Sequence, residues 1–175
     1  LKERADVSPF IVSELNALFP KVKEAMAKIK ELETNIESIA KTLKQYGLFR
    51  SAPGVGPITA ATMLVLLCNP AVFKNGREFA AYIGLAPKSS GSGGKNFVTH
   101  IPKKCECNNE VRTLLVQCAH SICRCRHKSD WVSSILARKP KKVAIIAIAN
   151  KLARQLWIMA KKGEKFEKRF ILAAV

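Results

Sequence analysis

A heptad repeat in the N-terminal part of the chain restricts that region to a long helix. Apolar residues recur there at alternating spacings of four and three: Ile11, Leu15, Leu18, Val22, Ala25, Ile29, Leu32, Ile36, Ile39, Leu43 and Tyr46. This period places them on one stripe of an α-helix, with mostly polar residues around it. Pro20 interrupts the pattern, and we expect it to open the main helix, because a missing N–H costs nothing at a first helical position. Gly47 is the expected stop.

The stripe has two interpretations. A long helix can bury it against its own domain, or the helix can project and dimerise as a coiled coil.

The predicted fold is mostly α: a coiled-coil-like helix over residues 1–47, a compact helical domain over 48–169, and an unassigned tail at 170–175. The later helices are expected at Arg77–Ile83, Glu110–Cys125 and Val143–Ala160, the last with Lys151 and Arg154 on its polar side.

The charge balance predicts a polyanionic partner. The 175 residues include 30 Lys+Arg against 13 Asp+Glu, a net charge of +17, and phosphate backbone is the commonest polyanion for a basic domain. Apolar residues at 48% allow a real core.

Runs such as Ala60–Cys68 are too short to cross a bilayer, and no signal peptide follows Leu1, so we expect a cytoplasmic protein without a membrane partner. Because Leu1 is not an initiator methionine, we also expect a fragment of a longer protein.

A glycine turn, Pro53-Gly54-Val55-Gly56-Pro57, separates two helical stretches as in a helix-hairpin-helix. The glycines let the backbone turn tightly and approach a ligand, and the second helix presents free N–H groups and a positive dipole end. A DNA phosphate fits there without base contacts, with Thr59 assisting. The alternative is a tight helix connection that binds nothing.

A Gly/Ser loop, KSSGSGGK from Lys88 to Lys95, lies between helix-forming stretches. Its composition suits a surface linker, but a loop embedded in an ordered domain is more often functional. Phe97–Ile101 is a candidate strand or arm, followed by Lys103 and Lys104.

The cysteines do not predict a metal site. Cys105-x-Cys107 and Cys123-x-Cys125, with His127 nearby, have one intervening residue where structural zinc usually has two to four. Disulfides are not expected without a secretory signal. Cys68 and Cys118 lie in apolar helical patterns and are expected in the core.

Several motifs in fixed order resemble one protein family. They are PGVGPITAATML, FKNGREFAAYIGLAPKSSGSGGK, RTLLVQCA and KKVAIIAIANKLARQLW, between Leu48 and Trp157. Together they resemble the C-terminal domain of transposases of the insertion sequence 110/1111 group (with 116/902), to which Piv-type DNA invertases are related. The GLAP…SGGK segment and its distance from the GVGP turn are the most specific part.

The resemblance implies a DNA recombinase in which Ser92, the serine of the SGG segment, attacks a DNA phosphodiester. Ser89 and Ser90 are rivals that only the family pattern ranks lower. The resemblance also implies an acidic N-terminal nuclease-like domain that binds Mg²⁺ and a structured guide RNA as a possible partner beside DNA. The heptads predict self-association through the long helix, since recombination joins several DNA ends. The residues expected to contact DNA phosphates are Gly54, Val55, Gly56, Thr59, Arg77, Lys88, Gly93, Gly94, Lys95, Lys103, Lys104 and Arg112.

Two departures from the family pattern bear on activity. The chain has only two aspartates, Asp6 and Asp130, so it cannot form the carboxylate cluster of a metal-assisted step, and we expect it to be inactive alone and to carry no cofactor. Residues 103–109 read KKCECNN where a Lys-Arg-Gly-Asn-like turn is usual. A non-catalytic nucleic-acid-binding module, and an interaction protein built around the heptad helix, remain alternatives.

Overall fold

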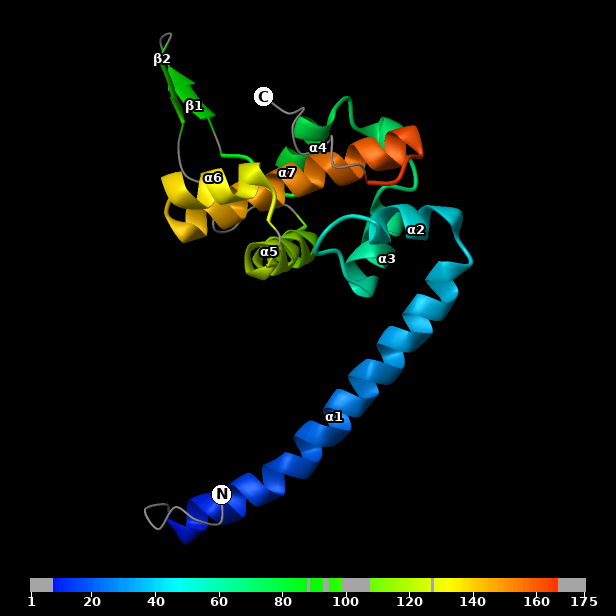
Figure 1. Cartoon of the computed structure of the whole chain (residues 1–175), viewed down its shortest axis with the longest axis vertical. Helices are drawn as coiled ribbons and strands as arrows, with labels where there is room; N and C mark the ends of the chain where they lie inside the picture. Colours follow the sequence, from blue (N-terminus) through cyan, green and yellow to red (C-terminus); the bar gives the residue numbers. More distant parts are fainter. Residues whose placement is uncertain (1–7, 88, 93–94, 99–107, 127, 167–175) are drawn as a thin grey trace.

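The computed structural model describes residues 8–87, 89–92, 95–98, 108–126 and 128–166, and these form a mostly α structure (Figure 1). The predicted fold class is therefore confirmed. Among these residues the elements are α1 (Pro9–Lys41), α2 (Lys44–Arg50), α3 (Pro57–Leu66), the 3₁₀ turn η1 (Pro70–Val72), α4 (Gly76–Tyr82), β1 (Ser89–Ser92), β2 (Lys95–Val98), α5 (Asn109–Arg124), α6 (Asp130–Arg138) and α7 (Lys141–Lys162).

The helix α1 runs without a break from Pro9 to Lys41, with Pro20 inside it. The expectation that Pro20 opens the helix is therefore wrong, and Pro9 takes the opening position instead. A proline within a long helix removes one hydrogen bond and adds a local clash, but its φ remains helical. Gly47 does not stop the helix either, because α1 ends at Lys41 and Gly47 lies inside α2.

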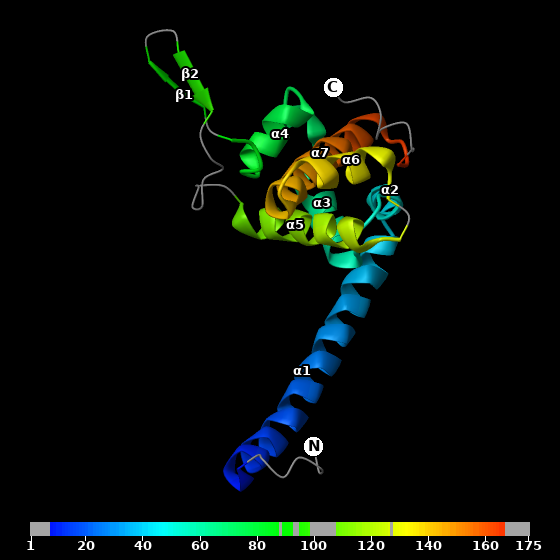
Figure 2. The same ribbon diagram turned by 60° about the vertical axis from the view of Figure 1, so that its left-hand side comes forward.

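The apolar stripe of α1 is exposed over most of its length. Figures 1 and 2 show α1 extending away from the other helices, so that only its C-terminal end meets α2 and α3. Ile29 is 56% exposed and Ile39 is 69% exposed. The interpretation in which α1 packs along its own domain is therefore wrong. Tyr46, the last residue of the predicted stripe, lies instead in the core as part of α2.

The other helices, α2 to α7, form a helical body around α7. Eleven residues of α7 are buried, and α5, α4, α2 and α6 all pack on it. Two hydrogen bonds tie distant segments to α7: Trp157 Nε1 donates to the Pro70 carbonyl over 3.0 Å, and Asn150 Nδ2 donates to the Leu85 carbonyl over 3.1 Å. Lys141–Lys162 is long and apolar enough to cross a membrane, but most of it is buried as the core helix of this body.

Local capping explains where the shorter helices start. Asn75, Asn108 and Ser129 each accept a hydrogen bond from a backbone N–H of the first turn of α4, α5 and α6. Gly163, with φ of +70°, ends α7 in the left-handed conformation that favours glycine. The predicted helices near Arg77, Glu110 and Val143 are confirmed to within about two residues, the usual uncertainty of a helix end.

Candidate functional site

The Gly/Ser loop forms the first strand of a small antiparallel hairpin whose second strand runs on to Val98. The strands β1 and β2 pair with Ser89 opposite Val98 and Ser92 opposite Lys95. Ser92 is thus the last residue of its strand, at the end of the ladder, whereas Ser89 lies at the other end. Figures 1 and 2 both show the hairpin standing away from the helical body, on a different side from α1. The backbone of Ser92 is therefore carried on a projection of the fold.

Several predicted phosphate contacts lie outside the described residues: Lys88, Gly93, Gly94, Lys103 and Lys104. The ladder does reach Lys95, which it sets opposite Ser92. Of the strand predicted over Phe97–Ile101, the described part ends at Val98. The pairing of this strand with Ser89–Ser92 was not predicted, because serine and glycine are poor strand formers and gave no alternating pattern.

Helices do flank the predicted glycine turn. The chain leaves α2 at Arg50 and enters α3 at Pro57, with Gly56 as its N-cap residue. The guanidinium of Arg50 donates a hydrogen bond to the Val55 carbonyl and so closes the turn. Sequence reasoning missed this role of Arg50, which no motif signals.

The two glycines of the turn have different surroundings. Gly54 has φ of +74°, and a Cβ there would lie 2.7 Å from the Cys118 carbonyl oxygen and 2.8 Å from Ile122 Cγ1. The close approach that Gly54 allows is therefore to helix α5 of the same chain and not to a ligand, which corrects the expectation. A Cβ at Gly56 would meet nothing within 4 Å, and Ile58 in the first turn of α3 is exposed. The N-terminus of α3 is therefore open to solvent on that side, although Thr59 in the same turn is buried.

Thr59 is not placed to assist a phosphate. Its side chain is 5% exposed, and its hydroxyl accepts a hydrogen bond from the Cys118 thiol over 3.5 Å. Burial raises the pKa of that thiol, and its hydrogen bond with Thr59 offsets the rise only in part. The predicted role of Thr59 is therefore wrong, because α5 packs over the face of α3 that carries it.

The remaining predicted cations are separated along the body. Arg77 is exposed in the first turn of α4, and Arg112 is half-buried near the start of α5. The exposed basic side chains that sequence reasoning did not select include a group at the end of α6 and the start of α7: Arg138, Lys139, Lys141 and Lys142.

All of the surplus positive charge lies beyond α1. Residues 9–41 contain five lysines and five glutamates, and residues 1–8 contain two basic and two acidic residues. The 23 basic and six acidic residues from position 42 onward therefore account for the whole net charge of +17. Any polyanion that the chain holds is attracted to the helical body and the hairpin rather than to α1.

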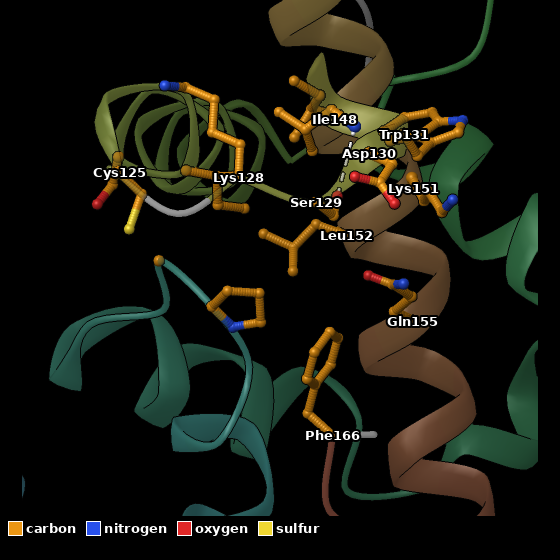
Figure 3. A pocket seen from close by; sticks show the side chains of 15 residues that line it. Cys125, Lys128, Ser129, Asp130, Trp131, Ile148, Lys151, Leu152, Gln155 and Phe166 are labelled. Carbon is orange, nitrogen blue, oxygen red and sulfur yellow. Dashed lines mark hydrogen bonds between the residues drawn. The ribbon is translucent and has the colours of Figure 1, made fainter. Parts of the chain in front are cut away.

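A pocket of about 540 Å³ opens between the glycine turn, the connection from α5 to α6, and α7 (Figure 3). Lys151 lines it and is 7% exposed, which corrects its expected place on the polar side of α7. Its ammonium lies 3.9 Å from the centre of the Trp131 ring. Burial, and secondarily the charge of Arg154, lower the pKa of Lys151 from its ordinary range.

The cysteines in the described part of the chain are free thiols: Cys68, Cys118, Cys123 and Cys125. Cys118 is buried as predicted, whereas Cys68 is exposed, because α3 ends at Leu66 and the next turn carries Cys68 outward. Within the same part, no three His, Cys, Asp or Glu side chains come together as metal ligands. Cys105, Cys107 and His127 lie outside the described residues.

Comparison with known proteins places this architecture in a family. Residues 46–133, which include the glycine turn, the hairpin and α5, match the family described as Transposase IS116/IS110/IS902. That match covers half of the chain. It begins in α2 and ends in α6, so it leaves out α1 and α7.

Individual relatives match more of the chain. The y4pF/y4sB protein of Sinorhizobium fredii is 34% identical over 90% of this chain and 42% of its own length. The transposase for insertion sequence element IS1328 of Yersinia enterocolitica is 30% identical over 95% of this chain and 51% of its own length. The transposase for IS1111A of Coxiella burnetii is 28% identical over 94% and 46%. The chain spans about half the length of these relatives. The family match and these relatives together show that the chain belongs to the IS116/IS110/IS902 transposase family.

Proposed function

We propose that the chain is the DNA-binding part of an insertion-sequence transposase, and that Ser92 is its nucleophile. The membership of the family carries the first statement. The position of Ser92 at the end of a projecting hairpin supports the second, since a DNA backbone can reach such a projection from outside the fold.

The proposed reaction is a transesterification. The Ser92 oxygen bonds to a backbone phosphorus while the bond from that phosphorus to a sugar oxygen breaks. The serine proton passes to a base, and the departing sugar oxygen takes up a proton to become a free hydroxyl end. Attack by another DNA hydroxyl reverses the step and rejoins the strand. Cations near the reacting phosphate stabilise its added charge, and Lys95, paired with Ser92 in the backbone ladder, is the first candidate.

The residues that the structure describes do not offer a site for Mg²⁺. Of its two aspartates, Asp130 opens α6 and Asp6 lies outside the described residues, and the described part of the chain holds no cluster of metal-ligating side chains. We therefore assign Mg²⁺, and with it full activity, to a further domain of the complete transposase. A structured guide RNA is the second polyanion that the positive body can hold.

We further propose that the chain self-associates through α1. Its exposed apolar stripe is long enough for several heptads, and a coiled coil with a second copy would cover it. Recombination joins several DNA ends, which is consistent with such an association.

Covalent capture tests the nucleophile. The complete transposase, incubated with element-end DNA, guide RNA and Mg²⁺, should yield a protein–DNA adduct that resists denaturation. We expect Ser92→Ala to lower adduct formation roughly a thousandfold or more while leaving DNA binding intact. Ser89→Ala and Ser90→Ala are the matched controls and should retain the adduct. An adduct that persists in Ser92→Ala shows that another group attacks.

The alternative function is a binding module without chemistry. The open N-terminus of α3 beside Gly56 favours it, because that end can hold a phosphate whether or not Ser92 reacts. This alternative predicts salt-sensitive DNA binding with no adduct from the complete protein under any condition.

A further inference from the structure

The pocket beside the glycine turn has no part in the proposed chemistry. Its volume of about 540 Å³ lies within the range of ligand pockets. It opens to solvent where Ser121, an exposed residue of α5, lines it. Pro53 and Gly54 of the turn also line it, on the side where Gly54 packs against α5.

The interior of the pocket suits a flat apolar ring. Figure 3 shows the ring of Phe166 and the side chain of Leu152 extending into the same space, and Ile148 also lines it. Phe166 is held in place through its backbone, since its N–H donates to Ser51 Oγ over 2.8 Å. A planar heterocycle in this space can stack on Phe166 while aliphatic side chains cover its edge.

Polar groups line the same pocket on one side. Gln155 extends into it from α7 and is 8% exposed, and Asp130 and Ser129 line the edge nearest α6 (Figure 3). An amide both donates and accepts hydrogen bonds, and a carboxylate accepts from an exocyclic amine. These donors and acceptors match the polar edge of a nucleobase, whereas a purely apolar ligand would make no use of them.

The surroundings of the pocket favour a base that is attached to phosphates. Lys128 lines the pocket, and Arg124 and Arg126 are exposed nearby at the end of α5. The open N-terminus of α3 follows the Pro53–Gly54 wall by two residues. A strand whose phosphate lies at that end can therefore direct a base into the pocket.

We propose that this pocket takes a single unstacked nucleobase of a bound DNA or RNA strand. The proposal rests on the proposed nucleic-acid binding and adds base contact to it. Base stacking on aromatic side chains is a general means of holding single strands. The pocket thus distinguishes an unpaired segment from a duplex, whose bases are stacked internally.

The test compares polymers with and without bases. The 175-residue chain is titrated with single-stranded oligonucleotides of roughly 12 nucleotides, a length within known site sizes, and with base-free sugar-phosphate polymers of equal length. We expect the base-bearing polymer to bind about tenfold more tightly. Ser121→Trp fills the pocket mouth and should reduce this ratio to about twofold or less, with binding of the base-free polymer unchanged. DNA and RNA are assayed separately, and the larger ratio identifies the source of the base.

Two further variants sharpen the result. Gln117→Trp adds the same bulk one turn earlier on α5, at an exposed position that does not line the pocket, and should keep the wild-type ratio. Phe166→Ala removes the stacking ring and should lower the ratio as Ser121→Trp does. Equal binding of both polymers, or a ratio that survives Ser121→Trp and Phe166→Ala, overturns the pocket proposal while leaving phosphate binding in place. Failure of both polymers to bind overturns the proposed nucleic-acid function itself.

Discussion

At the scale of single residues, the glycine turn shows how one motif serves two purposes. Gly54 gives the turn its left-handed backbone and its contact with α5, whereas Gly56 opens α3 toward solvent. Arg50 completes the turn through the Val55 carbonyl. The second glycine is therefore the one left for the proposed phosphate contact, whereas the first one packs against α5.

This division predicts unequal effects of alanine at the two glycines. Gly54→Ala places a methyl group against the Cys118 carbonyl and forces φ of +74° on an L-residue. We expect it to lower the free energy of unfolding by about 2–4 kcal/mol. Gly56→Ala, where nothing lies within 4 Å, should cost about 1 kcal/mol at most. Urea unfolding of both variants measures the difference, and equal losses would show that Gly54 does not make this contact in solution.

At the scale of elements, α1 differs from every helix of the body. Its stripe is apolar and exposed, and its charges cancel. In the described structure, it meets the body only near Lys41. Most of this helix therefore gains no burial from its own chain, and the proposed self-association would stabilise it.

Charged residues on the stripe should abolish self-association. Ile29→Lys with Ile36→Lys places two cations in the proposed seam, and we expect the dissociation constant of the dimer to rise about a hundredfold or more. Ala27→Lys with Thr34→Lys adds the same charges on the opposite face of α1, where both residues are exposed. This pair should leave the dissociation constant of the dimer unchanged. Sedimentation velocity distinguishes the two, and monomeric wild-type protein at high concentration would refute the proposed coiled coil. Neither pair should alter unfolding of the helical body.

At the scale of the whole molecule, charge and shape divide the chain into two parts. The neutral α1 extends from one side, and the positive body carries the hairpin on another (Figure 2). Such a distribution favours the body for the proposed nucleic-acid contact and leaves α1 for the proposed protein contact.

Binding of duplex DNA should therefore depend steeply on salt. We expect log Kd to rise with log salt concentration at a slope of about 4–6, which corresponds to roughly four to seven neutralised phosphates. Lys141→Gln with Lys142→Gln, at the exposed start of α7, should lower the slope by about 2. Lys23→Gln with Lys30→Gln on α1 removes the same amount of charge and should not change the slope. A slope lowered equally by both pairs would place α1 on the DNA.

The sequence by itself determined the local features of this protein. The heptad period predicted α1, and the apolar patterns predicted α5 and α7, because helix periodicity depends on neighbours within two turns. Pro20 misled the start of α1, because a proline costs a helix only a few kcal/mol, which the continuing pattern outweighs. Gly47 misled its end, because α1 already ends at Lys41 and Gly47 lies inside the next helix, α2. The ordered motifs also indicated the family, which the comparisons confirm.

Tertiary structure alone decided which faces were used. Nothing local to Thr59 or Gly54 announces that α5 covers them, and nothing local to Lys151 announces its burial against Trp131. The pocket joins Pro53, Asp130 and Phe166 across more than a hundred positions of the chain. Such contacts depend on how helices dock, since packing across the core selects among faces that the helical period leaves equivalent.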